Sequence, residues 1–272
     1  MKLKKDLLGN RMKDNYENRY RFSLTRRTPV IIRIDGKAFH TYTRGFEKPW
    51  DTILINTMLD TAWYLCTEIM GCKLAYIQSD EISLLLTDYD KLTSEAWFNN
   101  NLQKICSVSA SMATMAFNSC FANRVNNSTK LSNILNDSQD ENFEKIHNIH
   151  KERIGQAMFD ARAFNIPESE VCNYFIWRQQ DAIRNSIEML GHYYFKPKEL
   201  HKKNCNKIID MVKENKNIDW NNLSNELKNG SCIKKIIVNE NDKQDCKWIV
   251  DRNIPIFSQN RNYIEELLKI ND

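Results

Sequence analysis

Two acidic motifs at the ends of apolar segments give the clearest chemical signal in this chain. Asp35-Gly36 ends a β-branched run, and Asp80-Glu81 separates two further apolar segments. Mg²⁺ prefers carboxylate oxygens and substrate phosphates as ligands. If the two strand ends meet, Asp35, Asp80 and the Gly36 carbonyl could bind two Mg²⁺ ions, with Glu81 completing or orienting the shell. The motifs therefore predict phosphoryl or nucleotidyl transfer, with Asp35, Asp80 and Glu81 as catalytic candidates.

Basic residues surround the first motif and could bind a triphosphate. Arg33 and Lys37 lie on either side of it, and Arg44 and Lys48 follow within the next segment. A solvated loop would have the same composition, so these cations alone do not decide between a binding site and an ordinary surface. His40 is likewise ambiguous, because a single histidine is as consistent with a structural role as with catalysis.

The elements that would position these residues follow from hydrophobic periodicity. Their order is β-α-β-β-α-β-α, which is typical of a ferredoxin-like split βαβ unit, an α+β antiparallel sheet with helices on one face. The predicted strands cover 29–34, 73–77, 82–87 and 157–164, and the predicted helices cover 52–70, 94–121 and 169–194.

Less regular segments lie around this unit. A helix is expected before the first strand, and an Asn-rich, flexible or partly helical insertion is expected at 123–150. We predict a catalytic domain over residues 1–195 and a smaller C-terminal α/β extension over 196–272. The other expected segments are a helix at 6–24, a loop or short helix at 36–51, helical residues at 199–229, a hairpin of 234–238 with 248–250, and a closing helix at 261–270.

Composition excludes several classes of protein. The 272 residues are 42% hydrophobic, enough for a sizeable core, and the net charge of +4 permits but does not require a polyanionic partner. The eight cysteines form no CxxC pair, which favours free thiols in a reducing, cytoplasmic compartment. The N-terminus is basic but lacks the apolar stretch of a signal peptide, and no apolar run is long enough to predict a membrane span.

Three blocks, in order, resemble the histidine tRNA guanylyltransferase family: residues 32–51, 76–83 and 159–181. The resemblance covers roughly residues 5–200, and the segment 248–257 is also similar. It implies a palm-like domain related to those of 5′–3′ polymerases. It also implies nucleotide addition to the 5′ end of tRNA, in the 3′–5′ direction, after activation with ATP or from a 5′-triphosphate, and a homotetramer.

The resemblance also assigns residues. Asp35, Asp80 and the Gly36 carbonyl match the family's ligands for two Mg²⁺ ions, and Glu81 matches a third essential acidic position. The residues matching the segments that contact ATP, GTP or another nucleotide are Gly36, Lys37, Ala38, Phe39, His40, Lys48, Asp51 and Ser79. The candidates for tRNA binding are Arg33, Arg178, Arg184, Lys196 and Lys198.

One segment departs from the eukaryotic enzymes. Residues 183–189 read Ile-Arg-Asn-Ser-Ile-Glu-Met, where those enzymes have His-Ile-Asn-Asn-Leu-Tyr-Asn. This variant resembles guanylyltransferase-like, template-dependent 3′–5′ polymerases that repair truncated tRNA. We therefore expect templated repair first and addition of a single G to histidine tRNA second. Two other functions rank behind these. A nucleotide cyclase would carry a Gly-Gly-acidic hairpin, which this chain lacks. An inactive RNA-binding protein would have lost an acidic residue, and here none is lost.

Overall fold

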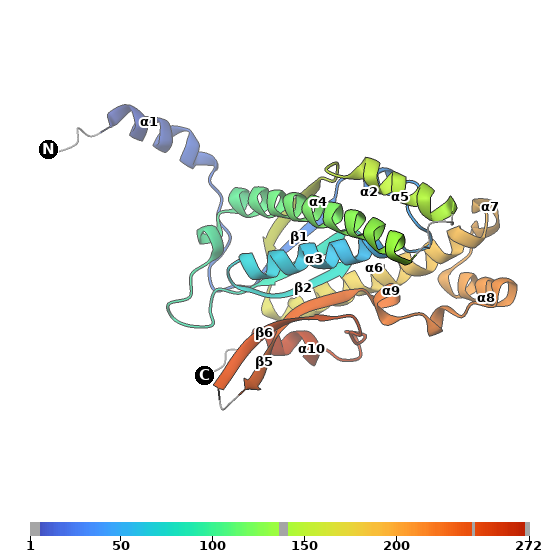
Figure 1. Ribbon diagram of the computed structural model, residues 1–272. Helices are drawn as coiled ribbons and strands as arrows, with labels where there is room; N and C mark the ends of the chain where they lie inside the picture. Colours follow the sequence, from blue (N-terminus) through green and yellow to red (C-terminus); the bar gives the residue numbers. More distant parts are fainter. Residues whose placement is uncertain (1–5, 136–140, 241–242, 270–272) are drawn as a thin grey trace.

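A six-stranded antiparallel sheet forms the centre of the computed structural model, which describes residues 6–135, 141–240 and 243–269 (Figure 1). The strand order is β4-β1-β3-β2-β5-β6. The first four strands in the chain thus have the arrangement of a split βαβ unit, and the predicted α+β class is confirmed. The strands are β1 (Val30–Gly36), β2 (Cys72–Gln78), β3 (Glu81–Leu86), β4 (Phe159–Asn165), β5 (Ser231–Glu240) and β6 (Lys243–Asp251).

Helices α3 (Thr52–Glu68) and α4 (Leu102–Leu135) cover one face of the sheet. Alternate residues of β1 point toward them: Ile32 and Ile34 are fully buried in the same cluster as Phe117 and Phe121 of α4. Helix α3 begins where predicted, because Asp51 accepts a hydrogen bond from the Leu54 N–H and so caps its N-terminus.

The opposite face is covered as well, which corrects the prediction of helices on one face only. Helix α6 (Glu168–Tyr194) packs Phe175 against Ile31 and Tyr76 of the sheet, and Phe257 from the C-terminal segment joins this second cluster. The physical reason is visible in the strands. All six residues of β3 are buried, so its apolar run has no solvent face and requires cover on both sides.

Several other boundaries differ from the sequence prediction. The N-terminal helix α1 covers only Leu7–Asn15 and is followed by a 3₁₀ turn. Helix α4 begins at Leu102 rather than at 94. The proposed 123–150 insertion contains the end of α4 and most of helix α5 (Glu141–Arg153), with residues 136–140 outside the described part. A four-residue helix, α2 (Phe39–Tyr42), lies in the segment that follows β1.

The C-terminal segment continues the main sheet. Strand β5 pairs with β2, so the hairpin β5–β6 is longer than predicted and adds two strands beside β2. The remaining helices are short and pack at the end of α6 and under the hairpin. They are α7 (Pro197–Leu200), α8 (Cys205–Lys216), α9 (Asn225–Asn229) and α10 (Asn262–Glu265).

One stretch of α4, Leu102–Ser128, is long and apolar enough by length and composition to cross a membrane. The same stretch packs Phe117, Phe121 and Val125 into the core beneath the sheet. A core helix of a folded protein satisfies the same criterion.

Candidate active site

The two acidic motifs meet at one end of the sheet, as the sequence predicted. Strand β1 pairs with β3 on one side and with β4 on the other, which places Glu81 and Asp160 opposite Asp35. The Gly36 N–H donates to the Asp80 carbonyl at 3.1 Å, so the end of β1 is joined to the turn between β2 and β3. Four carboxylates therefore gather at this edge.

Burial and the neighbouring negative charges raise the pKa values of two of these carboxyls. Burial is the main cause that raises the pKa of Asp80 to about 6, and Asp35 and Glu81 add to it, against the hydrogen bond that Ser79 donates at 3.0 Å. The pKa of Asp35 is also raised, first by burial and then by Glu81 and Asp160. A bound cation would relieve this repulsion.

The donor set suits Mg²⁺ better than a metal that needs a complete protein cage. Asp35, Asp80 and the Gly36 carbonyl offer oxygen ligands only. Among the described residues, no group of three or more His, Cys, Asp or Glu side chains is arranged to hold a metal by itself. Mg²⁺ commonly takes one or two carboxylates and fills its remaining positions with water and substrate phosphates. The residues present therefore fit a magnesium ion that is bound together with a nucleotide.

Unusual backbone geometry surrounds the carboxylates. Ala38 and Ser79 adopt left-handed conformations with φ of 54° and 48°, which cost energy for residues other than glycine. Gly36 is required for a different reason: a Cβ there would lie 2.2 Å from the Phe39 ring. Such strain is common where a backbone must be held in one position beside a ligand.

Phe39, one of the predicted nucleotide contacts, is largely buried. Its side chain is buried at 4% exposure and packs against Tyr42, Phe117 and Phe159 with ring centroids 4.9, 5.5 and 5.1 Å apart. The ring therefore anchors α2 to the core.

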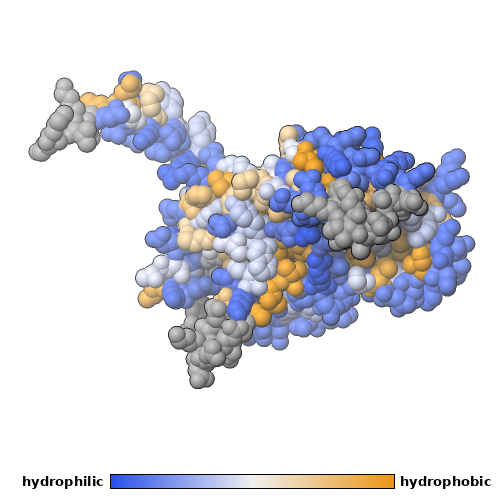
Figure 2. Space-filling model, in the orientation of Figure 1, coloured by the Kyte–Doolittle hydropathy of each residue, from blue (hydrophilic) through white to orange (hydrophobic). Residues whose placement is uncertain are grey.

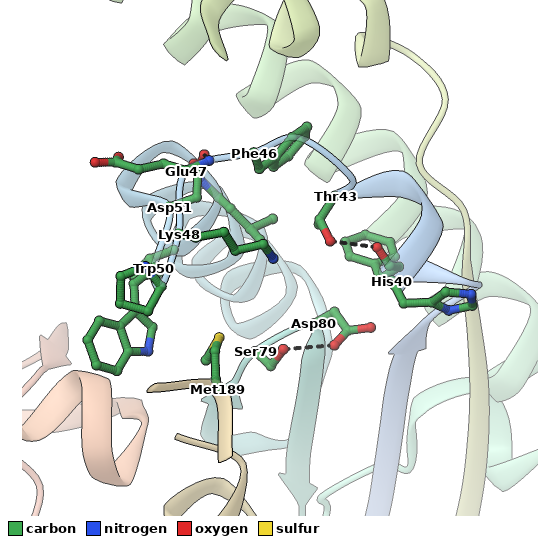
Figure 3. A pocket seen from close by; sticks show the side chains of 14 residues that line it. His40, Thr43, Phe46, Glu47, Lys48, Trp50, Asp51, Ser79, Asp80 and Met189 are labelled. Atoms are coloured by element: carbon green, nitrogen blue, oxygen red, sulfur yellow. Dashed lines mark hydrogen bonds between the residues drawn. The ribbon is translucent and has the colours of Figure 1, made fainter. Parts of the chain in front are cut away.

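A cavity of about 260 Å³ opens beside Asp80. In Figure 3 the Lys48 side chain extends over it, with Ser79 and Asp80 below. The predicted residues His40, Lys48, Asp51 and Ser79 all line it, together with Trp50. The other lining residues are Phe39, Thr43, Phe46, Glu47, Pro49, Leu54, Ile55, Asp80 and Met189.

Asp51 has a structural role that the sequence did not predict. Its carboxylate accepts hydrogen bonds from the Leu54 and Glu47 N–H groups at 2.9 and 3.0 Å, and from His150 Nε2 at 2.7 Å. These internal donors occupy the oxygens, and the residue is 5% exposed. Asp51 thereby fixes the loop that forms the cavity wall, and it also lines the cavity.

Arg178, predicted to contact RNA, forms a buried ion pair. Its Nε and Nη2 donate to the two oxygens of Glu81 at 2.8 and 2.6 Å, and Nη2 also lies 3.1 Å from Asp181. The side chain is only 8% exposed. Glu81, predicted as a catalytic acid, therefore faces Arg178 on α6 and is 3.3 Å from the Ser83 hydroxyl.

The other predicted RNA contacts occupy more open positions. Arg33 is half-buried, 5.6 Å from the centre of the Trp177 ring. Arg184 is exposed and reaches Asp181 at 3.3 Å. Lys196 and Lys198 are exposed at the start of α7, beyond the end of α6. Lys37, predicted to contact the nucleotide, is exposed next to Gly36.

The unusual segment 183–189 reaches the site. Asn185 and Met189 line a second, smaller cavity that adjoins the first, and Met189 lines both. Trp50 and Ser79 are also shared between the two cavities. The residues that distinguish this chain from the eukaryotic pattern are thus part of the wall next to the candidate nucleotide pocket.

Comparison with known families agrees with this geometry. A family model described as Thg1, tRNAHis guanylyltransferase, matches residues 9–167. The chain belongs to the Thg1 family. It is accordingly a nucleotidyltransferase of this family, and the resemblance inferred from the three sequence blocks is confirmed.

Similar Thg1-family proteins include two solved structures. A bacterial tRNA(His) guanylyltransferase (Thg1)-like protein in complex with ATP is 45% identical; the match covers 97% of this chain and 100% of that chain, with a TM-score of 0.78. A bacterial Thg1-like protein in complex with GTP is 43% identical, covers 97% and 99% of the two chains and has a TM-score of 0.75. An uncharacterised protein, R259 of Acanthamoeba polyphaga mimivirus, is 29% identical over 96% of this chain and 88% of its own length.

Two residues at the site were missed by sequence reasoning. Asp160 lies opposite Asp35, and its position at the start of the fourth strand, within a block already resembling the Thg1 family, was a usable signal. His150 contacts Asp51 from a helix almost one hundred residues further along the chain. No local pattern in the sequence could have paired it with Asp51.

Proposed function

We propose that this Thg1-family chain is a template-dependent 3′–5′ nucleotidyltransferase that adds nucleotides to the 5′ end of truncated tRNA. The single observation that carries the proposal is the convergence of Asp35, Gly36 and Asp80 beside a cavity into which Lys48 points. In this site the 5′ end is activated with ATP, or enters as a 5′-triphosphate. The 3′-hydroxyl of the incoming nucleotide then attacks it.

Each part of the site has a defined task. Two Mg²⁺ ions held by Asp35, the Gly36 carbonyl and Asp80 would neutralise the phosphates and activate the attacking hydroxyl. Lys48 binds the triphosphate as a point charge from the opposite wall. The strained turn at Ser79 holds Asp80 in place before substrate arrives, so little reorganisation is needed during the reaction. The ATP and GTP complexes of the two bacterial relatives support nucleotide binding by this chain.

The second candidate function is addition of a single G to histidine tRNA, which is the activity named by the family model. The segment 183–189 favours templated addition instead. It differs from the eukaryotic sequence, and its residues Asn185 and Met189 form the wall beside the candidate pocket. Membership of the Thg1 family sets aside the nucleotide cyclase and the inactive RNA-binding protein.

A nucleotide-addition assay separates the two candidates. Full-length tRNAs and tRNAs lacking their first nucleotide, of several identities, are offered with each NTP and Mg²⁺, using Asp80→Asn as the inactive control. Templated repair predicts that the added nucleotide always complements the base at the 3′ side of the acceptor stem. Addition of G alone, restricted to histidine tRNA and independent of the opposite base, would overturn the proposal.

We also propose that the chain assembles into a homotetramer. Helix α1 projects from the body, and Figure 2 shows apolar residues on this arm (Figures 1 and 2). Leu7 and Leu8 are 72% and 61% exposed, and no residue of α1 is buried. Contact with another copy would cover them. Light scattering on the intact chain and on a chain beginning at Phe22 tests this. A molar mass four times that of one chain, which falls when α1 is removed, supports the tetramer. A monomeric intact chain refutes it.

A further inference from the structure

Helix α5 contacts the candidate nucleotide pocket from behind through one buried hydrogen bond. His150 Nε2 lies 2.7 Å from Asp51 Oδ2, and the two side chains are 4% and 3% exposed. An ionised carboxylate can only accept hydrogen bonds, so the ring donates from Nε2. Burial away from water makes this bond stronger than a surface contact and makes its loss costly.

Asp51 transmits this contact to both ends of a short loop, residues 46–51, which we call the cavity loop. The oxygen that accepts from His150 also accepts from the Glu47 N–H at the start of the loop. The other oxygen accepts from the Leu54 N–H in the first turn of α3, just after the loop ends. His150 is the donor that comes from outside the loop and α3.

Apolar contacts connect the same helix with the loop. The ring of His150 lies edge-on to Phe46, with centroids 4.5 Å apart, and to Phe121 of α4 at 5.7 Å. The preceding residue, Ile149, lies so close to Gly45 that a Cβ there would be 2.8 Å from the Ile149 Cδ1. Helix α5 therefore supports the cavity loop at its beginning and, through Asp51, at its end.

The opposite side of this loop faces the cavity. Glu47, Lys48 and Trp50 all line it. Lys48 has no ion-pair partner among the residues that the structure describes, so the position of its ammonium group depends on the backbone on either side. That backbone is held by the Asp51 carboxylate, which His150 orients.

We propose that His150 is a positioning residue that holds the cavity loop, and with it Lys48, in the geometry that binds a nucleoside triphosphate. The proposal rests on the function proposed above for this pocket. It gives α5 a role in nucleotide affinity although none of its residues lines the cavity. Removing the hydrogen bond weakens triphosphate binding, while the carboxylates at the strand ends stay in place.

Two substitutions separate the hydrogen bond from the bulk of the ring. His150→Gln keeps an N–H donor near the position of Nε2, whereas His150→Leu fills similar space without a donor. The Kd for ATP with Mg²⁺ is measured by calorimetry on the full chain at a temperature where every variant is folded, and KM and kcat are measured separately for NTP and tRNA. We expect about a tenfold higher Kd and NTP KM for His150→Leu, the equivalent of one lost hydrogen bond, with His150→Gln within about twofold of the original chain.

Two controls give each outcome a meaning. Ile105→Ala removes buried volume near the start of α4 and should lower thermal stability without changing the Kd for ATP. Lys48→Ala tests the pocket itself. If Lys48→Ala raises the Kd but His150→Leu does not, or if His150→Gln is as impaired as His150→Leu, the positioning role is wrong. If neither Lys48→Ala nor His150→Leu changes the Kd, the pocket does not bind the triphosphate, and the proposed function fails with it.

Discussion

Arg178 and Glu81 form a buried, two-pronged ion pair directly behind the acidic edge of the sheet. The Nε and Nη2 atoms of the guanidinium donate to separate carboxylate oxygens at 2.8 and 2.6 Å. The pair connects α6 to the first residue of β3, next to the turn that carries Asp80. Glu81 is thereby neutralised by the protein itself, while Asp35 and Asp80 are left for a cation.

Replacing Arg178 should therefore destabilise the fold more than a surface charge would. We expect Arg178→Met to lower the free energy of unfolding by about 3–5 kcal/mol, because it leaves the Glu81 charge buried without a partner. Denaturant titration followed by circular dichroism measures this change. The double variant Glu81→Gln/Arg178→Met should recover part of the loss; a single variant with unchanged stability would contradict the assignment of a buried pair.

Substitution at the predicted metal-binding edge should abolish activity without lowering stability. Asp35→Asn and Asp80→Asn should each abolish Mg²⁺-dependent nucleotide addition. In the absence of metal, each should leave the folded state equally stable or more stable by about 1 kcal/mol, since one repelling charge is removed. A nucleotide-addition assay measures the loss of activity, and a thermal melt in EDTA measures the stability of the folded state. Full activity in either variant would refute the metal assignment.

The stability contributed by Asp51 should depend on pH in a defined direction. Burial would raise the pKa of this carboxyl, but hydrogen bonds from His150, Leu54 and Glu47 outweigh it and hold the pKa below the ordinary 3.8. A lowered pKa stabilises the fold above the unfolded value and loses that contribution as the pH falls through the folded value.

We therefore expect Asp51→Asn to be less stable than the original chain at pH 5 and above, by about 1–3 kcal/mol. The difference should shrink below about pH 4, where the aspartate of the original chain takes up a proton. Urea unfolding at a series of pH values measures it. A difference that grows as the solution becomes more acidic would contradict the lowered pKa.

The junction between the catalytic strands and the C-terminal hairpin depends on one glycine. Gly230 has φ +80°, and a Cβ there would lie 2.5 Å from the Ile77 carbonyl oxygen and 2.9 Å from the Tyr76 ring. Both residues belong to β2, immediately before the Ser79 turn. We expect Gly230→Ala to destabilise the chain by about 2 kcal/mol or more.

Limited proteolysis and hydrogen exchange can locate that effect. Faster exchange in β5 and at the end of β2 would show that the β2–β5 pairing has weakened. Lys228→Ala, two residues earlier and half-buried, is a matched substitution without the backbone constraint and should cost less. Equal stability of Gly230→Ala and the original chain would show that the turn can relax.

The sequence by itself determined the order of the strands and helices of the catalytic unit, because apolar periodicity and turn residues are local properties. It also placed Asp80 at the turn between two strands, since antiparallel neighbours joined by a two-residue turn leave little freedom of register. Asp35 meets this turn because β1 pairs with β3, a contact between segments far apart in the chain. The three family blocks identified the Thg1 family from the sequence alone, because each is a short local motif and the three occur in the family's order.

Only the tertiary structure decided what each charged side chain does. Arg178 and Asp51 lie in blocks that resemble the Thg1 family, yet burial assigns one to Glu81 and the other to His150. The strength of such a pair depends on solvent exclusion and on partners about one hundred residues away, which no local pattern encodes. The helical cover on the second face of the sheet was likewise decided by the tertiary structure. β3 and its neighbours are buried on both sides only once α6 and the C-terminal segment have packed.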